Sequence, residues 1–220
     1  IGSGGVVISD RLCPVDPDAR DHLYDRVEEV IEDYGADGVV LLDFGFIDED
    51  HCLCDVCKEE FYNDTGVDLS RAGSSSYNQQ LWARWREEQI KEVVGEVGNI
   101  TSQLGPAELG IALGDPFDRS EGYNYAEISD LADFTVVSPV DPTDMRVAAS
   151  MTDTPVYVRL SDDYVEYTIS TQNVEGAVGQ IEDLAEAGAS GMVFEYDVVY
   201  TPFWSELQPP SPSVQWLMNR

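Results

Sequence analysis

The chain has 220 residues, of which 43% are hydrophobic; this suits a folded domain with a sizeable core and excludes a disordered polypeptide. Lys and Arg together number 12, against 43 Asp and Glu residues, so the formal net charge is −31. Such a surface excludes binding to nucleic acid or to anionic membranes through a basic patch. No apolar run reaches the roughly 20 residues that a membrane-spanning helix needs, so we expect no membrane insertion.

The acidic residues are spread along the whole chain, whereas lysine occurs only at Lys58 and Lys91. At molar salt the Debye length falls to about 3 Å, which screens the mutual repulsion of so many carboxylates. We therefore interpret the charge as an adaptation to concentrated salt and expect a soluble protein of a halophilic organism, cytoplasmic rather than secreted. A polyanionic binding surface is the alternative. Because "IGSGGVVISD" has neither an initiator Met nor a signal-peptide pattern, we also expect an upstream segment of the same polypeptide.

Short apolar runs alternate with amphipathic segments along the chain. Residues 5–10 are predicted to form a strand and residues 16–35 a helix that ends at Gly35. The apolar residues that recur at helical spacing in this helix are Leu23, Val27, Val30, Ile31 and Tyr34. The run "DGVVLLDFGF" (37–46) is typical of a buried parallel strand.

The later segments continue the same alternation. Helices are predicted at 76–104, 124–132, 142–151, 173–188 and 213–220, and strands at 108–114, 134–140, 155–161 and 190–197. Six βα units of this kind predict an α/β fold with a parallel sheet, either a doubly wound open sheet or a (β/α)₈ barrel.

Two features favour the barrel. No glycine-rich phosphate-binding motif follows any strand. Several strands instead end in acidic residues, as expected where strand ends face a barrel's active site: Asp10, Asp43, Asp115, Asp162 and Glu195. We therefore predict one TIM-barrel-like domain over residues 1–220, which comprises the last six βα units of a larger barrel and lacks its first two strands.

Three of the four cysteines, Cys52, Cys54 and Cys57, fall within "HCLCDVCKEEF", and the fourth, Cys13, lies in "RLCPVDP". The separation between Cys13 and Cys52 is what one βα unit takes up, and loops after adjacent parallel strands lie side by side. We therefore predict a Cys₄ zinc site that ties two neighbouring loops together. Four thiolates leave no coordination position for water, so this zinc would be structural.

Alternatives to zinc remain open at this point. Two disulfides would require one bridge to close within the segment 52–57. The four thiols would otherwise be buried and unpaired, or Cys54 and Cys57 would open the helix of a thioredoxin-like redox unit. His51 is an alternative metal ligand, whereas His22 is expected on the exposed side of its helix.

The combination of "LCP" (12–14) with "CLCDVCKEEF" (52–61), directly after "DGVVLLDFGF", resembles the family 42 β-galactosidases and related uncharacterised hydrolase-like barrels. "LWARWREEQI" (81–90) is similar to the helix that follows in such barrels, so the resemblance covers about residues 5 to 95. In those galactosidases four cysteines bind zinc beyond neighbouring strands. The resemblance implies the same arrangement here and a glycoside hydrolase-like protein that acts on or binds a carbohydrate.

The family places its acid/base Glu after an Asn at the end of the fourth strand, nine positions before the clustered cysteines. That position is Asp43 here, preceded by Leu42, and the strand expected to carry the nucleophile Glu offers Asp162 instead. We therefore take Asp43 as the candidate acid, Glu195 as the candidate nucleophile or base, and Asp162 as a reserve. Two such carboxyls lie about 5–5.5 Å apart in retaining glycosidases and roughly 6.5–9.5 Å apart in inverting ones.

Aromatic residues that would form a sugar platform follow the same two strands, namely Phe44, Phe46, Tyr196, Tyr200 and Trp204. Trp82 and Trp85, in the long helix, are predicted to face the core and anchor the helix against the sheet. The alternative to a hydrolase is a zinc-stapled barrel without hydrolytic activity that binds sugar or serves as a scaffold. The absence of the family's Asn-Glu pair and of its second Glu favours that alternative.

Overall fold

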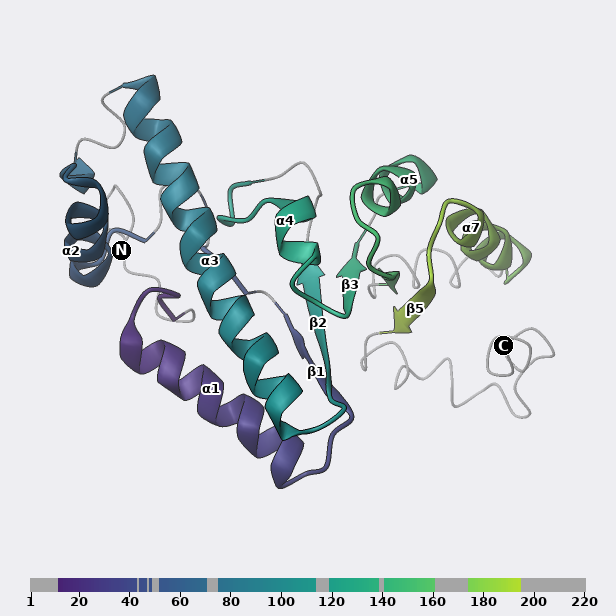
Figure 1. The fold of residues 1–220 in the computed structure, drawn as a ribbon. Helices are drawn as coiled ribbons and strands as arrows, with labels where there is room; N and C mark the ends of the chain where they lie inside the picture. The colour runs from purple at the N-terminus through teal and green to yellow at the C-terminus, as the bar shows by residue number, and fades with distance from the viewer. Residues whose placement is uncertain are drawn as a thin grey trace. The chain divides into compact units, whose positions relative to one another are not determined.

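The computed structural model of the chain describes residues 12–42, 44–46, 48, 52–70, 75–113, 119–138, 141–160 and 174–194. The elements in chain order are α1 (Pro17–Glu32), β1 (Gly38–Leu41), α2 (Asp55–Thr65), α3 (Ser76–Leu104), β2 (Glu108–Leu113), α4 (Tyr125–Ser129), β3 (Phe134–Val137), α5 (Pro142–Ser150), β4 (Val156–Leu160), α7 (Val174–Glu186) and β5 (Gly191–Phe194) (Figure 1). The chain divides into two compact units, Ile1–Thr135 and Val136–Arg220.

The strands form a five-stranded sheet in the order β1-β2-β3-β4-β5. β1 and β2 run parallel with Val39 opposite Leu109, and β4 and β5 run parallel with Val158 opposite Met192. Helices separate consecutive strands, so the predicted α/β fold with a parallel sheet is confirmed. The strand predicted at 5–10 and the helix predicted at 213–220 lie outside the described residues. The closed barrel and the single domain stay predictions.

α1 begins where the sequence predicts and ends at Glu32, three residues before the predicted limit at Gly35. The Asp16 carboxylate accepts hydrogen bonds from two backbone amides of the first turn, at 3.0 and 3.3 Å, and Pro17 occupies the first helical position. Gly35 adopts a φ of +66°, and its amide donates to the carbonyl of Ile31 at 3.1 Å. This left-handed residue ends the helix, as glycine does in many proteins.

The buried face of α1 is narrower than its apolar spacing suggests. Val27 and Ile31 are buried and Leu23 is half-buried, a row at four-residue spacing along one side of the helix. Val30 and Tyr34 are 37% and 75% exposed, so their expected place on the apolar face is wrong. Val30 lies outside this row, and Tyr34 follows the last helical residue.

β1 is shorter and more exposed than the buried strand predicted for 37–46. It comprises Gly38–Leu41, in which Leu41 is buried but Val40 is 41% exposed. Leu42, which follows it, is 57% exposed. Among the described strands β1 pairs only with β2, which accounts for this exposure.

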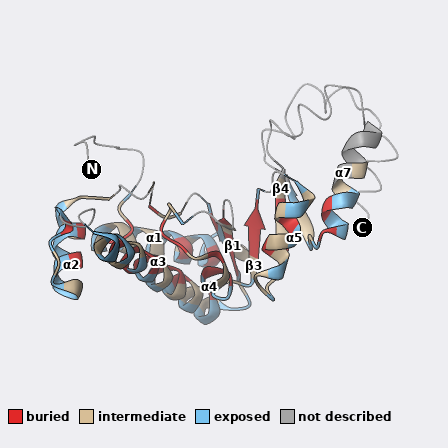
Figure 2. Cartoon of the chain, turned by 90° about the horizontal axis from the view of Figure 1, so that it is seen from above, coloured by how far each residue is buried: buried red, intermediate tan, exposed pale blue. Residues whose placement is uncertain are grey.

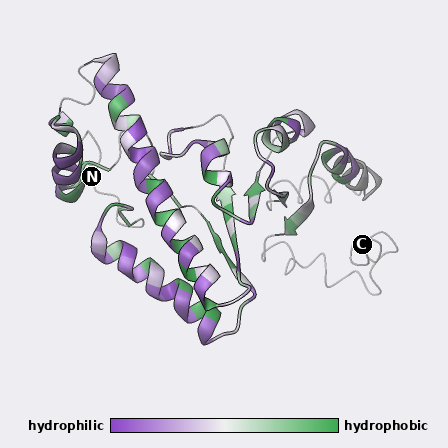
Figure 3. Ribbon diagram, in the orientation of Figure 1, coloured by the Kyte–Doolittle hydropathy of each residue, from purple (hydrophilic) through white to green (hydrophobic). Residues whose placement is uncertain are grey.

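α3 has the bounds that the sequence predicts and packs against α1 (Figure 1). The Ser75 hydroxyl accepts a hydrogen bond from the Asn78 amide at 3.2 Å and caps the helix. Figure 3 shows mainly hydrophobic strands beside helices of mixed character, the pattern of helices with one buried face.

An aromatic cluster holds α2 against α3. The rings of Trp82 and Trp85 stack with centroids 5.2 Å apart, and Phe61 of α2 meets both edge-on at 5.4 and 5.5 Å. The Trp85 Nε1 also donates to Asp64 Oδ2 of α2 at 2.7 Å. Trp82 and Trp85 are each 6% exposed, so their predicted burial in the core is confirmed, but these contacts are to α2 and not to the sheet.

The second unit contains the βαβ arrangement β4-α7-β5. Buried residues of α5, β4 and the end of α7 include Met145, Val158 and Leu184, and α5 contacts α7. β3 is buried along most of its length (Figure 2). None of the described helices is long and apolar enough to cross a membrane.

Candidate metal centre

The four cysteines come together in one cluster. Their Sγ atoms all lie within 4.8 Å of one another. The Sγ of Cys13 lies 3.4 Å from that of Cys57 and 3.7 Å from that of Cys54. No disulfide joins any of the four, all of which belong to the described part of the chain. The predicted convergence of Cys13 with the distant Cys-x-Cys-x-x-Cys segment is confirmed.

The sulfur spacing fits a single tetrahedral metal ion. Four ligands at the Zn–S distance of about 2.3 Å stand about 3.8 Å apart along the edges of a tetrahedron. The Cys13–Cys57 and Cys13–Cys54 separations, 3.4 and 3.7 Å, are close to this value. Tetrahedral all-sulfur sites are typical of zinc and of iron. The cluster can therefore hold a metal ion such as zinc.

The turn before α1 fixes Cys13. The Asp16 amide donates to the Cys13 carbonyl at 3.2 Å, so residues 13–16 form a hydrogen-bonded turn. The next carbonyl, that of Pro14, accepts a hydrogen bond from Arg20 Nε at 2.7 Å. Pro14 and Val15 are buried. The turn that contains Cys13 is thus held against the first turns of α1.

The start of α2 positions two further thiols. Cys54 is the N-cap residue, and its Sγ accepts a hydrogen bond from the backbone amide of Cys57 at 3.4 Å. Cys57 itself stands in the first turn and is fully buried. Amide donors and the positive end of a helix dipole stabilise negative charge on sulfur. The Cys-x-x-Cys spacing thus places two thiols at the amino-terminal end of the helix.

The thiols perturb one another strongly. The hydrogen bond with Cys52 raises the pKa of Cys13 to about 12, the contact with Cys57 lowers it in part, and burial raises it further. Hydrogen bonds from Cys13 and Cys57 lower the pKa of Cys52, whereas hydrogen bonds with Cys13 and Cys52, followed by burial, raise that of Cys57. One thiolate is thus stabilised by neighbours that keep their protons. A bound dication would offset the negative charge that arises when the other thiols lose their protons.

A hollow of about 510 Å³ opens beside the cysteine cluster. Its lining is polar and apolar in about equal parts and includes Leu12, Cys13, Pro14, Arg20, Leu23, Leu42, Phe44 and Val93. It lies at the carboxyl end of β1, the edge where parallel α/β folds bind ligands. Phe44, one of the predicted sugar-binding residues, therefore borders a cavity of ligand size.

Phe46 occupies a different environment from the open platform that the sequence suggests. It is 1% exposed, and its ring packs edge-on against Trp82 with centroids 6.1 Å apart. The Arg86 guanidinium carbon lies 4.5 Å from the centroid of the same ring. Phe46 is therefore part of the core, where it contacts α3.

The predicted catalytic residues Asp43, Asp162 and Glu195 lie outside the described residues, as do Tyr196, Tyr200 and Trp204. The alternative ligand His51 also lies outside them. The roles of all these residues stay predictions. His22 is exposed on α1, as expected.

Arg86, which no sequence motif singles out, is 1% exposed. Its Nη2 donates to the backbone carbonyls of Asp48, at 2.7 Å, and of Ser120. A signal for its burial is present in the sequence, because Arg86 falls in the row Trp82, Arg86, Ile90 and Val94, whose other members are apolar.

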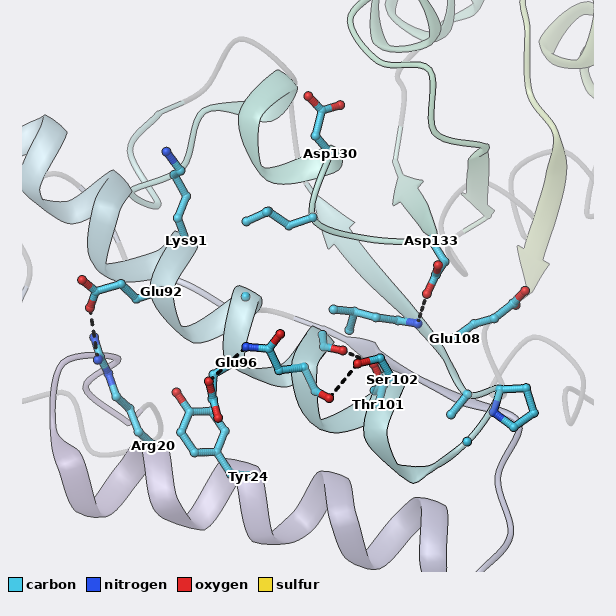
Figure 4. A pocket seen from close by; sticks show the side chains of 18 residues that line it. Arg20, Tyr24, Lys91, Glu92, Glu96, Thr101, Ser102, Glu108, Asp130 and Asp133 are labelled. Carbon is cyan, nitrogen blue, oxygen red and sulfur yellow. Dashed lines mark hydrogen bonds and ion pairs between the residues drawn. The ribbon is translucent and has the colours of Figure 1, made fainter.

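A larger groove, of about 1020 Å³, lies between α1, α3 and the start of β2 (Figure 4). Its acidic lining comprises Glu92, Glu96, Glu108, Asp130 and Asp133. Arg20 of α1 reaches Glu92 at 3.5 Å, and Asp133 accepts a hydrogen bond from the Leu109 amide at 2.8 Å. The end of the groove at Glu108 lies at the amino-terminal edge of the sheet, where residues of parallel α/β folds contribute stability rather than ligand contacts.

Comparison with known proteins finds no relative, since neither a protein-family model nor a curated protein matches the chain. Its function is therefore inferred from its own residues.

Proposed function

We propose that the chain is a zinc-binding α/β protein in which Cys13, Cys52, Cys54 and Cys57 hold one structural Zn²⁺. The observation that carries this proposal is the approach of all four sulfur atoms to within 4.8 Å of one another. Zinc supplies a positive charge that binds four thiolates and leaves no position for water. Its role is to fasten the turn before α1 to the loop that leads into α2.

The chain supports such a centre from both sides. Hydrogen bonds to Asp16 and Arg20 hold the Cys13 segment, and the Cys57 amide already donates to the Cys54 sulfur. Backbone amides that donate to metal-bound sulfur orient the ligands and stabilise their charge. The fold therefore already brings the four ligands together, so little conformational entropy is lost when the metal binds.

The test is elemental analysis of protein purified in concentrated salt without added metal. About one zinc per chain is expected for the wild type. Cys57→Ser should lose the metal, because it removes a buried ligand, whereas Tyr62→Ser should keep it, since Tyr62 is 57% exposed on the same helix. Protein without metal, or Cys57→Ser protein with a full equivalent, would overturn the proposal. Iron in place of zinc would assign the same site to another ion.

A second proposal concerns the ligand. The chain is a glycoside hydrolase-like barrel that binds or cleaves a carbohydrate at the hollow beside the zinc site, with Asp43 as acid, Glu195 as nucleophile or base and Asp162 in reserve. Its support is the position of the hollow at the carboxyl end of β1, next to Cys13 and lined by Phe44. An aromatic ring at such a rim suits the apolar face of a sugar.

A glycan array and a panel of glycosides, both in concentrated salt, test this second proposal. Phe44→Ala should weaken sugar binding, and Asp43→Asn and Glu195→Gln should stop hydrolysis while binding persists. If the wild type binds a glycan but hydrolyses none, the chain is the alternative predicted from the sequence, a sugar-binding protein without hydrolytic activity. A wild type that neither binds nor hydrolyses any glycan would contradict a carbohydrate function. That result would leave the zinc proposal unaffected.

A further inference from the structure

Arg86 joins the loops that follow two adjacent strands. It belongs to α3, is 1% exposed, and donates through Nη2 to the Asp48 carbonyl at 2.7 Å and to the Ser120 carbonyl. Asp48 lies after β1 and Ser120 after β2, and these strands are parallel neighbours. Both loops therefore leave the sheet at one edge, and one buried guanidinium holds both.

The Phe46 ring and amide complete this contact. The Arg86 guanidinium carbon lies 4.5 Å from the centroid of the Phe46 ring, within the range of a cation–π interaction. The Phe46 amide donates to the Glu121 carbonyl at 2.8 Å, which links the two loops directly. We call Phe46, Asp48, Arg86 and residues 120–122 the loop junction.

The junction lies next to the metal site along the backbone. Asp48 precedes Cys52 by four positions. The carbonyl that Arg86 binds thus belongs to the segment that delivers Cys52 to the cysteine cluster.

The junction also reaches the cysteines through side chains. The Phe46 ring contacts Trp82 at 6.1 Å between centroids, and Trp82 contacts Phe61 at 5.4 Å. Phe61 belongs to α2, the helix that carries Cys57. The aromatic rings therefore connect the junction to the other half of the metal loop.

We propose that Arg86 is a positioning residue for the metal centre: by holding the Asp48 carbonyl and the Phe46 ring, it keeps the segment before Cys52 in place and strengthens zinc binding. This inference rests on the proposed function, because it presupposes that the cysteines bind zinc. It assigns a role to a buried cation that holds the backbone before Cys52.

Chain length sets the size of the effect. Ten positions, 42–51, separate the end of β1 from Cys52, but three, 49–51, separate Asp48 from Cys52. The probability of loop closure falls with roughly the 3/2 power of length. Release of Asp48 from Arg86 should therefore weaken zinc binding by up to about sixfold, the limit reached if Phe46 is released as well.

Chelator competition in concentrated salt measures this effect on four proteins: wild type, Arg86→Met, Arg86→Lys and Arg84→Met. Arg86→Met should bind zinc up to about sixfold more weakly by loop closure. Arg86→Lys should fall between it and the wild type, because an ammonium can donate to the carbonyls but lacks the planar guanidinium that packs on the Phe46 ring. Arg84 is exposed on the same helix, so Arg84→Met is the matched control and should bind as the wild type does.

The possible outcomes separate this inference from the function on which it rests. A folded Arg86→Met protein with wild-type zinc affinity overturns the role of Arg86 alone, and a lower melting temperature with unchanged affinity marks a purely structural residue. A wild type that binds no zinc overturns the proposed function.

A measurement on the wild type keeps the inference testable if the Arg86 variants do not fold. Coupling between the metal and the junction is reciprocal, so zinc should slow hydrogen exchange at the Phe46 amide. The Ser190 amide, which donates to the Val156 carbonyl at 2.7 Å in the second unit, is the reference. Equal exchange at Phe46 with zinc and with chelator would overturn the inference.

Discussion

Cys13 and Cys57 lie 44 positions apart in the chain, and their Sγ atoms are 3.4 Å apart in the structure. Cys13 precedes α1 and Cys57 stands in the first turn of α2, so both α1 and β1 lie between the two thiols in the chain. A metal ion bound to both would act as a cross-link that restricts the unfolded chain.

Removal of zinc should therefore destabilise the fold. For a cross-link that closes a loop of this length, the chain-entropy relation gives about 4 kcal/mol. In a protein of this size that corresponds to a melting temperature about 8–16 °C lower. Scanning calorimetry with and without chelator measures the shift. Cys57→Ser protein should melt alike in both conditions, and a wild type insensitive to chelator would count against the cross-link.

Zinc affinity should rise with pH. In the metal-free protein the pKa of Cys13 is raised to about 12 and that of Cys57 is also raised, so both thiols carry protons at neutral pH. Zinc binds thiolates and releases these protons, and release of at least two protons makes affinity increase at least about 100-fold per pH unit. Titration calorimetry in buffers of different ionisation heat counts the protons. An affinity that is constant from about pH 6 to 8 would contradict thiolate ligation.

Gly122→Ala should destabilise the loop junction. Gly122 has a φ of +82°, and a Cβ there would come within 2.6 Å of the Phe46 ring. Left-handed strain and overpacking together should cost about 1–3 kcal/mol.

Gly95→Ala is the control for that change, because Gly95 lies within α3 with nothing near a new Cβ. It should leave stability unchanged or raise it by up to about 1 kcal/mol. Urea unfolding of both variants provides the comparison. Equal stability of the two would show that the close approach of Gly122 to Phe46 is not maintained in solution.

Concentrated salt should stabilise the fold. The net charge is −31, and the exposed acids of α1 include Asp21, Asp25 and Glu28. The Debye length falls from about 10 Å at 0.1 M salt to about 3 Å at 1 M, so repulsion between such carboxylates fades. The melting temperature should rise over this range, to the same extent in NaCl and KCl. A fall, or no change, would contradict the interpretation of the charge as salt adaptation.

The sequence predicted best what local patterns control. The long helix runs over Ser76–Leu104 as expected, because a serine cap begins it and helical spacing continues without interruption. The cysteine cluster was also predictable, since three cysteines at metal-ligand spacing and a fourth one βα unit away are the pattern of a four-cysteine site. Both results depend on residue type and spacing alone.

Tertiary packing decided the rest. Val40 and Leu42 look buried in an apolar run, but their exposure depends on which strands lie beside β1. Phe46 looks like a rim aromatic, yet Trp82 and Arg86 cover it. Arg86 resembles its exposed neighbour Arg84, and only its place in the buried row of α3 distinguishes it.

X-ray absorption at the zinc edge, on protein purified without added metal, tests the central claim most directly. The predicted spectrum is that of one zinc ion with four sulfur neighbours at about 2.3 Å, contributed by Cys13, Cys52, Cys54 and Cys57. A shell in which nitrogen or oxygen replaces sulfur, or a protein that carries no metal, would contradict it.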